Sequence, residues 1–168
     1  MAQFRRSRTA KRVRADARAA VALSAAALLL AAPCRAAQSA PVVRIPQGTL
    51  AGVRQGSVDA FLGIPYAAPP VGRNRWRAPQ PAPRWEGIRP AKQFAASCWQ
   101  VITPAGTGPW THEYVPQGRA SENCLYLNIW TPAADVHRRM PVLVWIPGGG
   151  FVSGSGSAAV YDGARLAA

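Results

Sequence analysis

The pattern of apolar and polar positions after residue 40 predicts short β-strands and no long helix. Residues 42–54 contain two short apolar runs around Ile45-Pro46-Gln47-Gly48, where Pro second and Gly last are typical of a type I turn. This region is therefore predicted to form an antiparallel hairpin. Residues 61–64 are predicted to form a short buried strand, and residues 124–130 alternate well enough to predict another.

The most informative run is Val142–Ile146, which is continuously apolar and too short for a helix. It predicts a strand buried on both faces, as in a parallel sheet covered by helices. Pro147 has no N–H and suits the end of that strand. Gly148–Gly150 can adopt positive φ and leave their amides uncovered. Uncovered amides there suit an oxyanion hole, in which one donor contributes about 3–4 kcal/mol, although a plain glycine turn or a phosphate loop would share the pattern.

The remaining segments carry weaker signals. Residues 71–90 alternate prolines and arginines with two tryptophans and are predicted to form an ordered, irregular arm, because large aromatics usually find packing partners. Residues 91–100 are predicted to hold one short helical turn, and residues 101–120 a loop rich in Gly, Pro and Thr. Residues 158–168 are expected to begin a helix without a stop signal.

Charge divides the chain into a leader and a mature part. The 168 residues carry a net charge of +13, and eight of the 20 basic residues lie within 1–40 beside one acidic residue. A basic segment, an apolar run of about fourteen residues and small residues near position 36 predict a secretory signal peptide over residues 1–40. A mitochondrial transit peptide, twin-arginine export at Arg5-Arg6 and a lipoprotein anchor at Cys34 fit less well. The apolar run is short for a bilayer span, so no stable membrane span is expected after leader removal.

The mature part, residues 41–168, excludes several function classes. Its basic residues are scattered singly and no nucleic-acid motif is present, so no nucleic-acid partner is expected. Two cysteines remain, Cys98 and Cys124, and an even count in an exported protein suggests a disulfide. His112 and His137 do not have ligand spacing, so no metal or other cofactor is expected.

Four stretches together resemble the start of type-B carboxylesterases, the cholinesterase-like branch of the α/β-hydrolases. A further match follows at Tyr161-Asp162-Gly163, and the resemblance covers nearly all of residues 41–168. It implies an α/β fold, namely the amino-terminal part of an α/β-hydrolase, with a hairpin, the first strands of the central sheet and an irregular arm. The four stretches are F-L-G-I-P-Y-A-A-P-P (61–70), R-W-R-A-P-Q-P (75–81) with Trp85-Glu86-Gly87, S-E-N-C-L-Y-L-N-I-W-T-P (121–132) and P-V-L-V-W-I-P-G-G-G-F (141–151).

The resemblance also implies roles for individual residues. Gly149 and Gly150 match the amide donors of the family's oxyanion hole, with Gly148 in support. Cys98 and Cys124 match its first disulfide, and Arg75 with Glu122 matches a structural ion pair between the arm and a strand. Trp110 and Tyr114 match a loop that lines the family's site entrance, although ordinary packing explains aromatics equally well. Three positions depart from the family pattern: Pro147 where many members have His, Asn123 where Asp is usual, and Trp76 where Phe is common.

The family's nucleophile is missing from these residues. It lies in Gly-x-Ser-x-Gly, with its acid and histidine later in the chain, whereas Ser153, Ser155 and Ser157 lack a glycine two positions earlier. Both histidines are interpreted as surface residues. The chain is therefore expected to be a truncated amino-terminal part of a carboxylesterase domain, inactive alone, with its apolar strand exposed and solubility poor.

The expected function is hydrolysis of a small-molecule carboxylic ester by a secreted or periplasmic serine esterase. Two alternatives come from other classes. One is a cholinesterase-like protein that has lost catalysis and serves in adhesion or binding. The other is a nucleotide-binding module, suggested by Gly154-x-Gly156-x-x-Ala159 and by the P-loop spacing of 149–154, although Ser155 replaces the required lysine.

Overall fold

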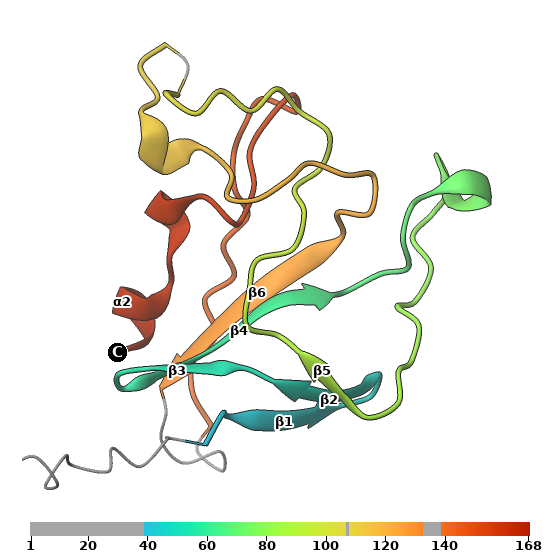
Figure 1. Cartoon of the computed structure of the whole chain (residues 1–168), viewed down its shortest axis with the longest axis vertical. Helices are drawn as coiled ribbons and strands as arrows, with labels where there is room; N and C mark the ends of the chain where they lie inside the picture. Colours follow the sequence, from blue (N-terminus) through green and yellow to red (C-terminus); the bar gives the residue numbers. More distant parts are fainter. Residues whose placement is uncertain (1–38, 107, 133–138) are drawn as a thin grey trace, which may run out of the picture. The chain divides into compact units, whose positions relative to one another are not determined.

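The computed structural model describes residues 39–106, 108–132 and 139–168. Nearly all of the predicted signal peptide, residues 1–40, therefore lies outside the described residues. The described strands form two three-stranded sheets, ordered β1-β2-β5 and β3-β4-β6 (Figure 1). Within these ranges no helix has both the length and the apolar character that a membrane span requires.

The first sheet begins with the predicted antiparallel hairpin, which is confirmed. β1 (Val42–Ile45) pairs with β2 (Gly48–Ala51), and β5 (Ile88–Pro90) runs parallel to β2 on its other edge. A Cβ at Gly48 would lie 2.6 Å from the indole nitrogen of Trp85. The same indole N–H donates a 2.9 Å hydrogen bond to a carbonyl of β2. Glycine is required at this turn because the tryptophan ring packs directly on the backbone.

The second sheet contains the strands that later support the candidate site. β3 (Val53–Gln55), β4 (Val58–Pro65) and β6 (Tyr126–Pro132) pair antiparallel. The strand predicted at residues 61–64 is confirmed and begins earlier, because the turn before it brings β3 alongside. The strand predicted at residues 124–130 is also confirmed, shifted by two residues at each end.

The two sheets share one small apolar core. The backbone of Ala91 joins them, since its N–H donates to the carbonyl of Ala51 at 2.7 Å and its carbonyl accepts from the amide of Leu62 at 2.8 Å. The side chains of Ile45 and Trp85 cover the core from outside. Its four buried members come from β2, β4 and the residue after β5: Leu50, Phe61, Ile64 and Ala91.

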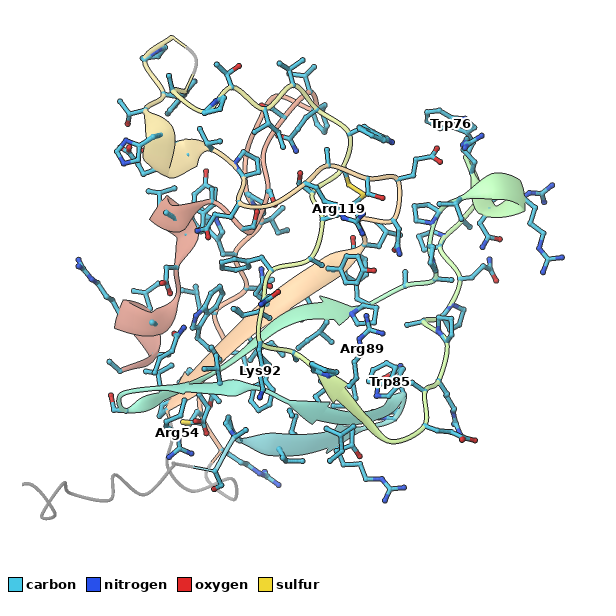
Figure 2. The ribbon with its side chains drawn as sticks, in the orientation of Figure 1. Arg54, Trp76, Trp85, Arg89, Lys92 and Arg119 are labelled. Carbon is cyan, nitrogen blue, oxygen red and sulfur yellow. A yellow bond between two sulfur atoms is a disulfide. The ribbon has the colours of Figure 1, made fainter. Side chains whose placement is uncertain are left out.

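The arm predicted over residues 71–90 is irregular apart from the 3₁₀ helix η1 (Gly72–Asn74) and its last three residues, which form β5. Its two tryptophans differ. Trp85 packs against the core, and the guanidinium of Arg89 lies 5.4 Å from its ring centre. Trp76 is 97% exposed and has a left-handed φ of 62° (Figure 2). The expectation that the arm's aromatics are packed is therefore confirmed for Trp85 and wrong for Trp76.

Of the two helical predictions, one is wrong and one is confirmed. The helical turn expected in residues 91–100 is absent, because the backbone there pairs with another segment: Ser97 donates to residue 119 and accepts from residue 121. The helix expected to begin in residues 158–168 is confirmed by the 3₁₀ helix η3 (Ala159–Tyr161) and the short helix α2 (Ala164–Ala167).

The prediction of a buried strand at Val142–Ile146 is wrong. The segment belongs to no strand, and its five side chains are between 63% and 86% exposed. A run that is apolar at every position needs neighbours on both faces and both edges, and the described residues supply no strand beside it. The exposure expected for this run in the chain alone is thus observed.

Candidate functional site

The glycine loop, defined here as residues 147–154, folds back on itself through Gly149. The amides of Val152 and Ser153 both donate to the carbonyl of Gly149 at 3.1 Å. Gly149 has a φ of 144°, and a Cβ there would lie 1.8 Å from the carbonyl oxygen of Ser153. No side chain fits at this approach, so the turn requires glycine at position 149.

The next two residues continue in the left-handed region. Gly150 has a φ of 59° with nothing within 4 Å of an added Cβ, and Phe151 has a φ of 63° with its side chain fully exposed. A bulky residue rarely adopts this conformation. Among the described residues, the amides of Gly149 and Gly150 donate no hydrogen bond. The loop therefore presents two amide donors without partners in the described structure.

The carboxyl end of the loop is held by the side chain of Gln100. Its Oε1 accepts from the amide of Gly154 at 2.9 Å, and its Nε2 donates to the carbonyl of Gly154 at 3.0 Å. Gly154 in turn packs on Gly148, since an added Cβ would lie 2.1 Å from the Gly148 carbonyl oxygen. Gln100 therefore holds Gly154, and Gly154 directly contacts Gly148, the first glycine of the loop.

The residues after the loop are held by two further side chains. Asn128 on β6 accepts from the amide of Gly63 at 2.9 Å and donates to the carbonyl of Gly156 at 3.1 Å. Gly63 lies in the irregular part of β4, where φ is 68° and the amide does not join the ladder. The hydroxyl of Ser157 accepts from the amide of Gln117 at 3.0 Å and donates to its carbonyl at 3.2 Å.

These contacts argue against phosphate binding at Gly154 and Gly156. The amide of Gly154 is occupied by Gln100, and Gly156 presents its carbonyl to Asn128. A phosphate site needs several free amides pointing at one anion. The lysine that such a site requires is also absent at Ser155.

The disulfide loop, residues 98–124, supplies both Gln100 and Gln117. Cys98 and Cys124 form the predicted disulfide, with their Cα atoms 4.9 Å apart. Tyr114 stacks edge-on with Trp110 at 5.0 Å between ring centres and contacts Tyr161 at 6.4 Å. Tyr114 therefore packs on the segment that follows the glycine loop, and Trp110 packs on Tyr114.

Arg75 and Glu122 also meet, with the Nε and Nη2 of the guanidinium each 2.7 Å from a carboxylate oxygen. The hydrogen bond from Arg75 lowers the pKa of Glu122, and the same bond raises the pKa of Arg75. The pair joins the arm to the residues before β6 and does not touch the glycine loop.

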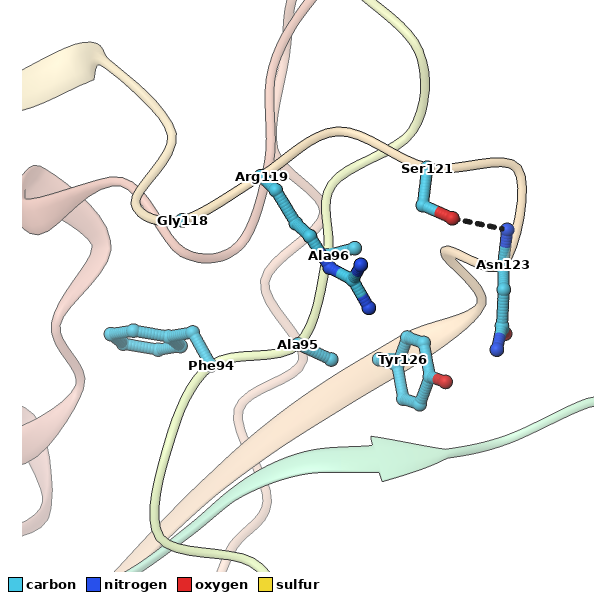
Figure 3. A pocket seen from close by; sticks show the side chains of 8 residues that line it. All are labelled: Phe94, Ala95, Ala96, Gly118, Arg119, Ser121, Asn123 and Tyr126. Carbon is cyan, nitrogen blue, oxygen red and sulfur yellow. Dashed lines mark hydrogen bonds between the residues drawn. The ribbon is translucent and has the colours of Figure 1, made fainter.

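A cavity of about 280 Å³ lies on another part of the disulfide loop (Figure 3). The side chain of Arg119 extends past Ala96 toward Tyr126, and the hydroxyl of Ser121 accepts from the amide of Asn123 at 3.2 Å. The cavity has no residue of the glycine loop in its wall. It is lined by Phe94, Ala95, Ala96, Gly118, Arg119, Ser121, Asn123 and Tyr126.

The part of the chain that the structure describes holds no nucleophile with a base beside it. The hydroxyls of Ser155 and Ser157 contact each other at 3.0 Å, and Ser153 donates to Gly149. His112 is a surface residue, as predicted, and its Nδ1 lies 3.6 Å from a carboxylate oxygen of Glu113. His137 lies outside the described residues, and no group of three metal-ligating side chains occurs within them.

Sequence reasoning did not identify Gln100, Asn128 or Ser157 as parts of this site. Asn128 could have been identified, because a polar amide within an otherwise apolar strand indicates that its side chain makes hydrogen bonds. Gln100 and Ser157 lie in polar loops, where no local sequence pattern indicates their contacts. Gln100 contacts a residue 54 positions away, and Ser157 contacts one 40 positions away.

Two small sheets, a disulfide-closed loop and a glycine loop with uncovered amides define a part of an α/β-hydrolase. The model of the Carboxylesterase family matches residues 39–168, so the chain belongs to that family.

The chain is 45% identical over 123 residues to the acetylcholinesterase of Danio rerio, a match that covers 72% of this chain and 19% of that protein. It is 44% identical over 126 residues to the fumonisin B1 esterase of Sphingopyxis macrogoltabida, covering 71% and 21%. A solved PNB esterase structure matches with a TM-score of 0.66 and 36% identity, covering 77% of this chain and 26% of that one. The chain thus spans about a fifth of the length of these curated relatives.

Proposed function

We propose that this chain supplies the oxyanion-binding loop of a serine carboxylesterase. The observation that carries the proposal is the geometry at Gly149, whose tight turn leaves its own amide and that of Gly150 without partners among the described residues. Amide donors fixed in this way stabilise the charge that develops on a carbonyl oxygen during acyl transfer.

In the proposed reaction, a serine from outside these residues attacks the ester carbonyl and gives its proton to a histidine base. The carbonyl π electrons move to oxygen, and the amides of Gly149 and Gly150 donate to that oxyanion. Collapse of the intermediate breaks the bond to the alkoxide, which takes the proton from the histidine and leaves as the alcohol. Water, deprotonated by the same histidine, then attacks the acyl-serine, and the serine recovers that proton as the acid leaves. Because the 168 residues contain no Gly-x-Ser-x-Gly, we expect the chain alone to be inactive.

The substrate is proposed to be a small carboxylic ester, in keeping with the names of the relatives, and no cofactor enters the reaction. We also propose export to the periplasm or the medium, supported by the basic and apolar pattern of residues 1–40 and by the disulfide. The adhesion alternative predicts the same fold with no hydrolysis, so an activity measurement separates the two.

The test is a chimaera in which residues 41–168 replace the matching segment of the PNB esterase, assayed with p-nitrophenyl acetate. Gly149→Ala places a Cβ 1.8 Å from a carbonyl oxygen and should lower kcat by about 10²-fold, the usual loss for one misplaced donor. Gly56→Ala is the control, because Gly56 has a φ of 63° in open space outside the site.

Gly150→Ala is matched to that control in φ and in free space, so the two variants carry equal backbone strain. A larger loss of kcat for Gly150→Ala than for Gly56→Ala supports the oxyanion role. A folded chimaera that is inactive, or one that tolerates Gly149→Ala, would contradict the proposed function.

A further inference from the structure

The side chain of Gln100 is the link between the disulfide loop and the glycine loop. It makes two hydrogen bonds to Gly154, one to the N–H at 2.9 Å and one to the carbonyl at 3.0 Å. A carboxamide has a donor and an acceptor side by side, so it pairs with a backbone residue as a neighbouring strand would. Few other side chains can reproduce both bonds.

The position of Gln100 is itself fixed. Its Nε2 also donates to the carbonyl of Cys98 at 3.1 Å, and Cys98 is bonded to Cys124 just before β6. The clamp on Gly154 is therefore tied to the second sheet through the disulfide.

The glycine loop depends on this clamp because its other end is not held by a sheet. Val142–Ile146 joins no strand, so the loop is supported from its carboxyl side. Gly154 packs on Gly148, and the turn from Gly149 to Ser153 is closed by its own hydrogen bonds. A shift of Gly154 must therefore move the turn that presents the two amide donors.

We propose that Gln100 is a positioning residue for the oxyanion loop, acting through Gly154 and without contact to substrate. The inference rests on the proposed function for its catalytic meaning, whereas the clamp itself can be tested in the chain alone. Asn128 and Ser157 hold residues 155–157, beyond the glycine loop, whereas the two side-chain hydrogen bonds to Gly154 itself come from Gln100.

The first test measures amide hydrogen exchange by mass spectrometry on the whole chain at low concentration. Gln100→Ala should speed exchange in the peptide that contains Val152, Ser153 and Gly154 by about tenfold, the value of one lost hydrogen bond. Exchange in β4 should stay unchanged. Gln100→Glu keeps the acceptor and loses the donor, so its exchange rate should fall between those of the unaltered chain and Gln100→Ala.

Gln117→Ala is the matched control, since Gln117 is an exposed glutamine of the same loop that contacts Ser157 only through its backbone. Unchanged exchange at residues 152–154 in Gln100→Ala would overturn the proposal. An equal rise in β4, or an equal rise in Gln117→Ala, would overturn it as well.

The second test uses the chimaera described above. Gln100→Ala should lower kcat for p-nitrophenyl acetate about tenfold with little change in KM, and Gln100→Glu should recover part of the loss. An unaltered chimaera that folds but does not hydrolyse the ester counts against the proposed function. If the chimaera is active and Gln100→Ala leaves its kcat unchanged, the result counts against the positioning role alone.

Discussion

At the scale of single residues, the ion pair between Arg75 and Glu122 shows what a surface contact can do. Both side chains are partly exposed, at 49% and 36%, so the pair adds little to overall stability. Its bidentate geometry instead fixes where the arm meets the segment before β6. The pair lies beside Trp76, whose left-handed φ needs local support.

The pair should respond to acid. The pKa of Glu122 is lowered in the folded chain by its hydrogen bond from Arg75. The contact therefore stabilises the folded chain at pH values above the ordinary glutamate pKa of about 4.3. This stabilisation is lost as the pH falls through the lowered pKa. A titration that follows the Nε–H signal of Arg75 should show a midpoint below the ordinary glutamate value. A midpoint at or above that value would contradict the bonded geometry.

At neutral pH, Glu122→Gln should free the arm and speed tryptic cleavage after Arg73 and Arg77, which lie beside Arg75. The charge-matched control is Glu86→Gln, because Glu86 is exposed and makes no ion pair among the described residues. Equal cleavage in the two variants would show that the pair does not hold the arm.

At the scale of elements, local sequence patterns predicted the strands and turns that local interactions stabilise. The hairpin at residues 42–51 follows from its turn residues, and β4 and β6 follow from apolar runs that a small sheet can bury. The predicted turn in residues 91–100 failed because the backbone there pairs with residues 119–121, a partner that no local pattern reveals. Gln100 was missed for the same reason.

The disulfide should set the order of the loop that carries Gln100. It closes a loop with a sequence separation of 26, worth roughly 3–4 kcal/mol in the chain-entropy description. Reduction should therefore speed tryptic cleavage after Arg119, within that loop. Cleavage after Arg54 should not change, because Arg54 lies in β3 and pairs with Asp59.

A Cys98→Ser/Cys124→Ser chain should be cleaved quickly after Arg119 with or without reductant. A rise in cleavage at both arginines on reduction would instead indicate general unfolding of the chain.

At the scale of the whole molecule, the exposed apolar surface is the dominant property. Five consecutive side chains at Val142–Ile146 are mostly exposed, and Leu127 and Ile129 on β6 are 38% and 46% exposed. Contiguous apolar surface of this kind favours self-association. The chain is therefore expected to bind a hydrophobic dye and to associate as its concentration rises.

Val142→Lys with Val144→Lys should reduce both dye binding and association, measured by fluorescence and by sedimentation. The control adds the same charge at Thr103→Lys and Ala105→Lys, two exposed positions of the disulfide loop. Equal improvement in the control would mean that net charge, not this segment, governs solubility. Sedimentation of the unaltered chain as a monomer at every concentration would contradict the expected association.

The sequence by itself determined the family, the first hairpin, the strands β4 and β6, and, through the resemblance to the family, the residues of the disulfide and of the ion pair. Each of these features is indicated by a local sequence pattern or by spaced motifs that members of the family share. Only the tertiary structure decided that Val142–Ile146 joins no strand and that Gln100 clamps Gly154. Burial and clamping depend on which distant segments are present to make contact, and a residue's own neighbours along the chain do not encode that.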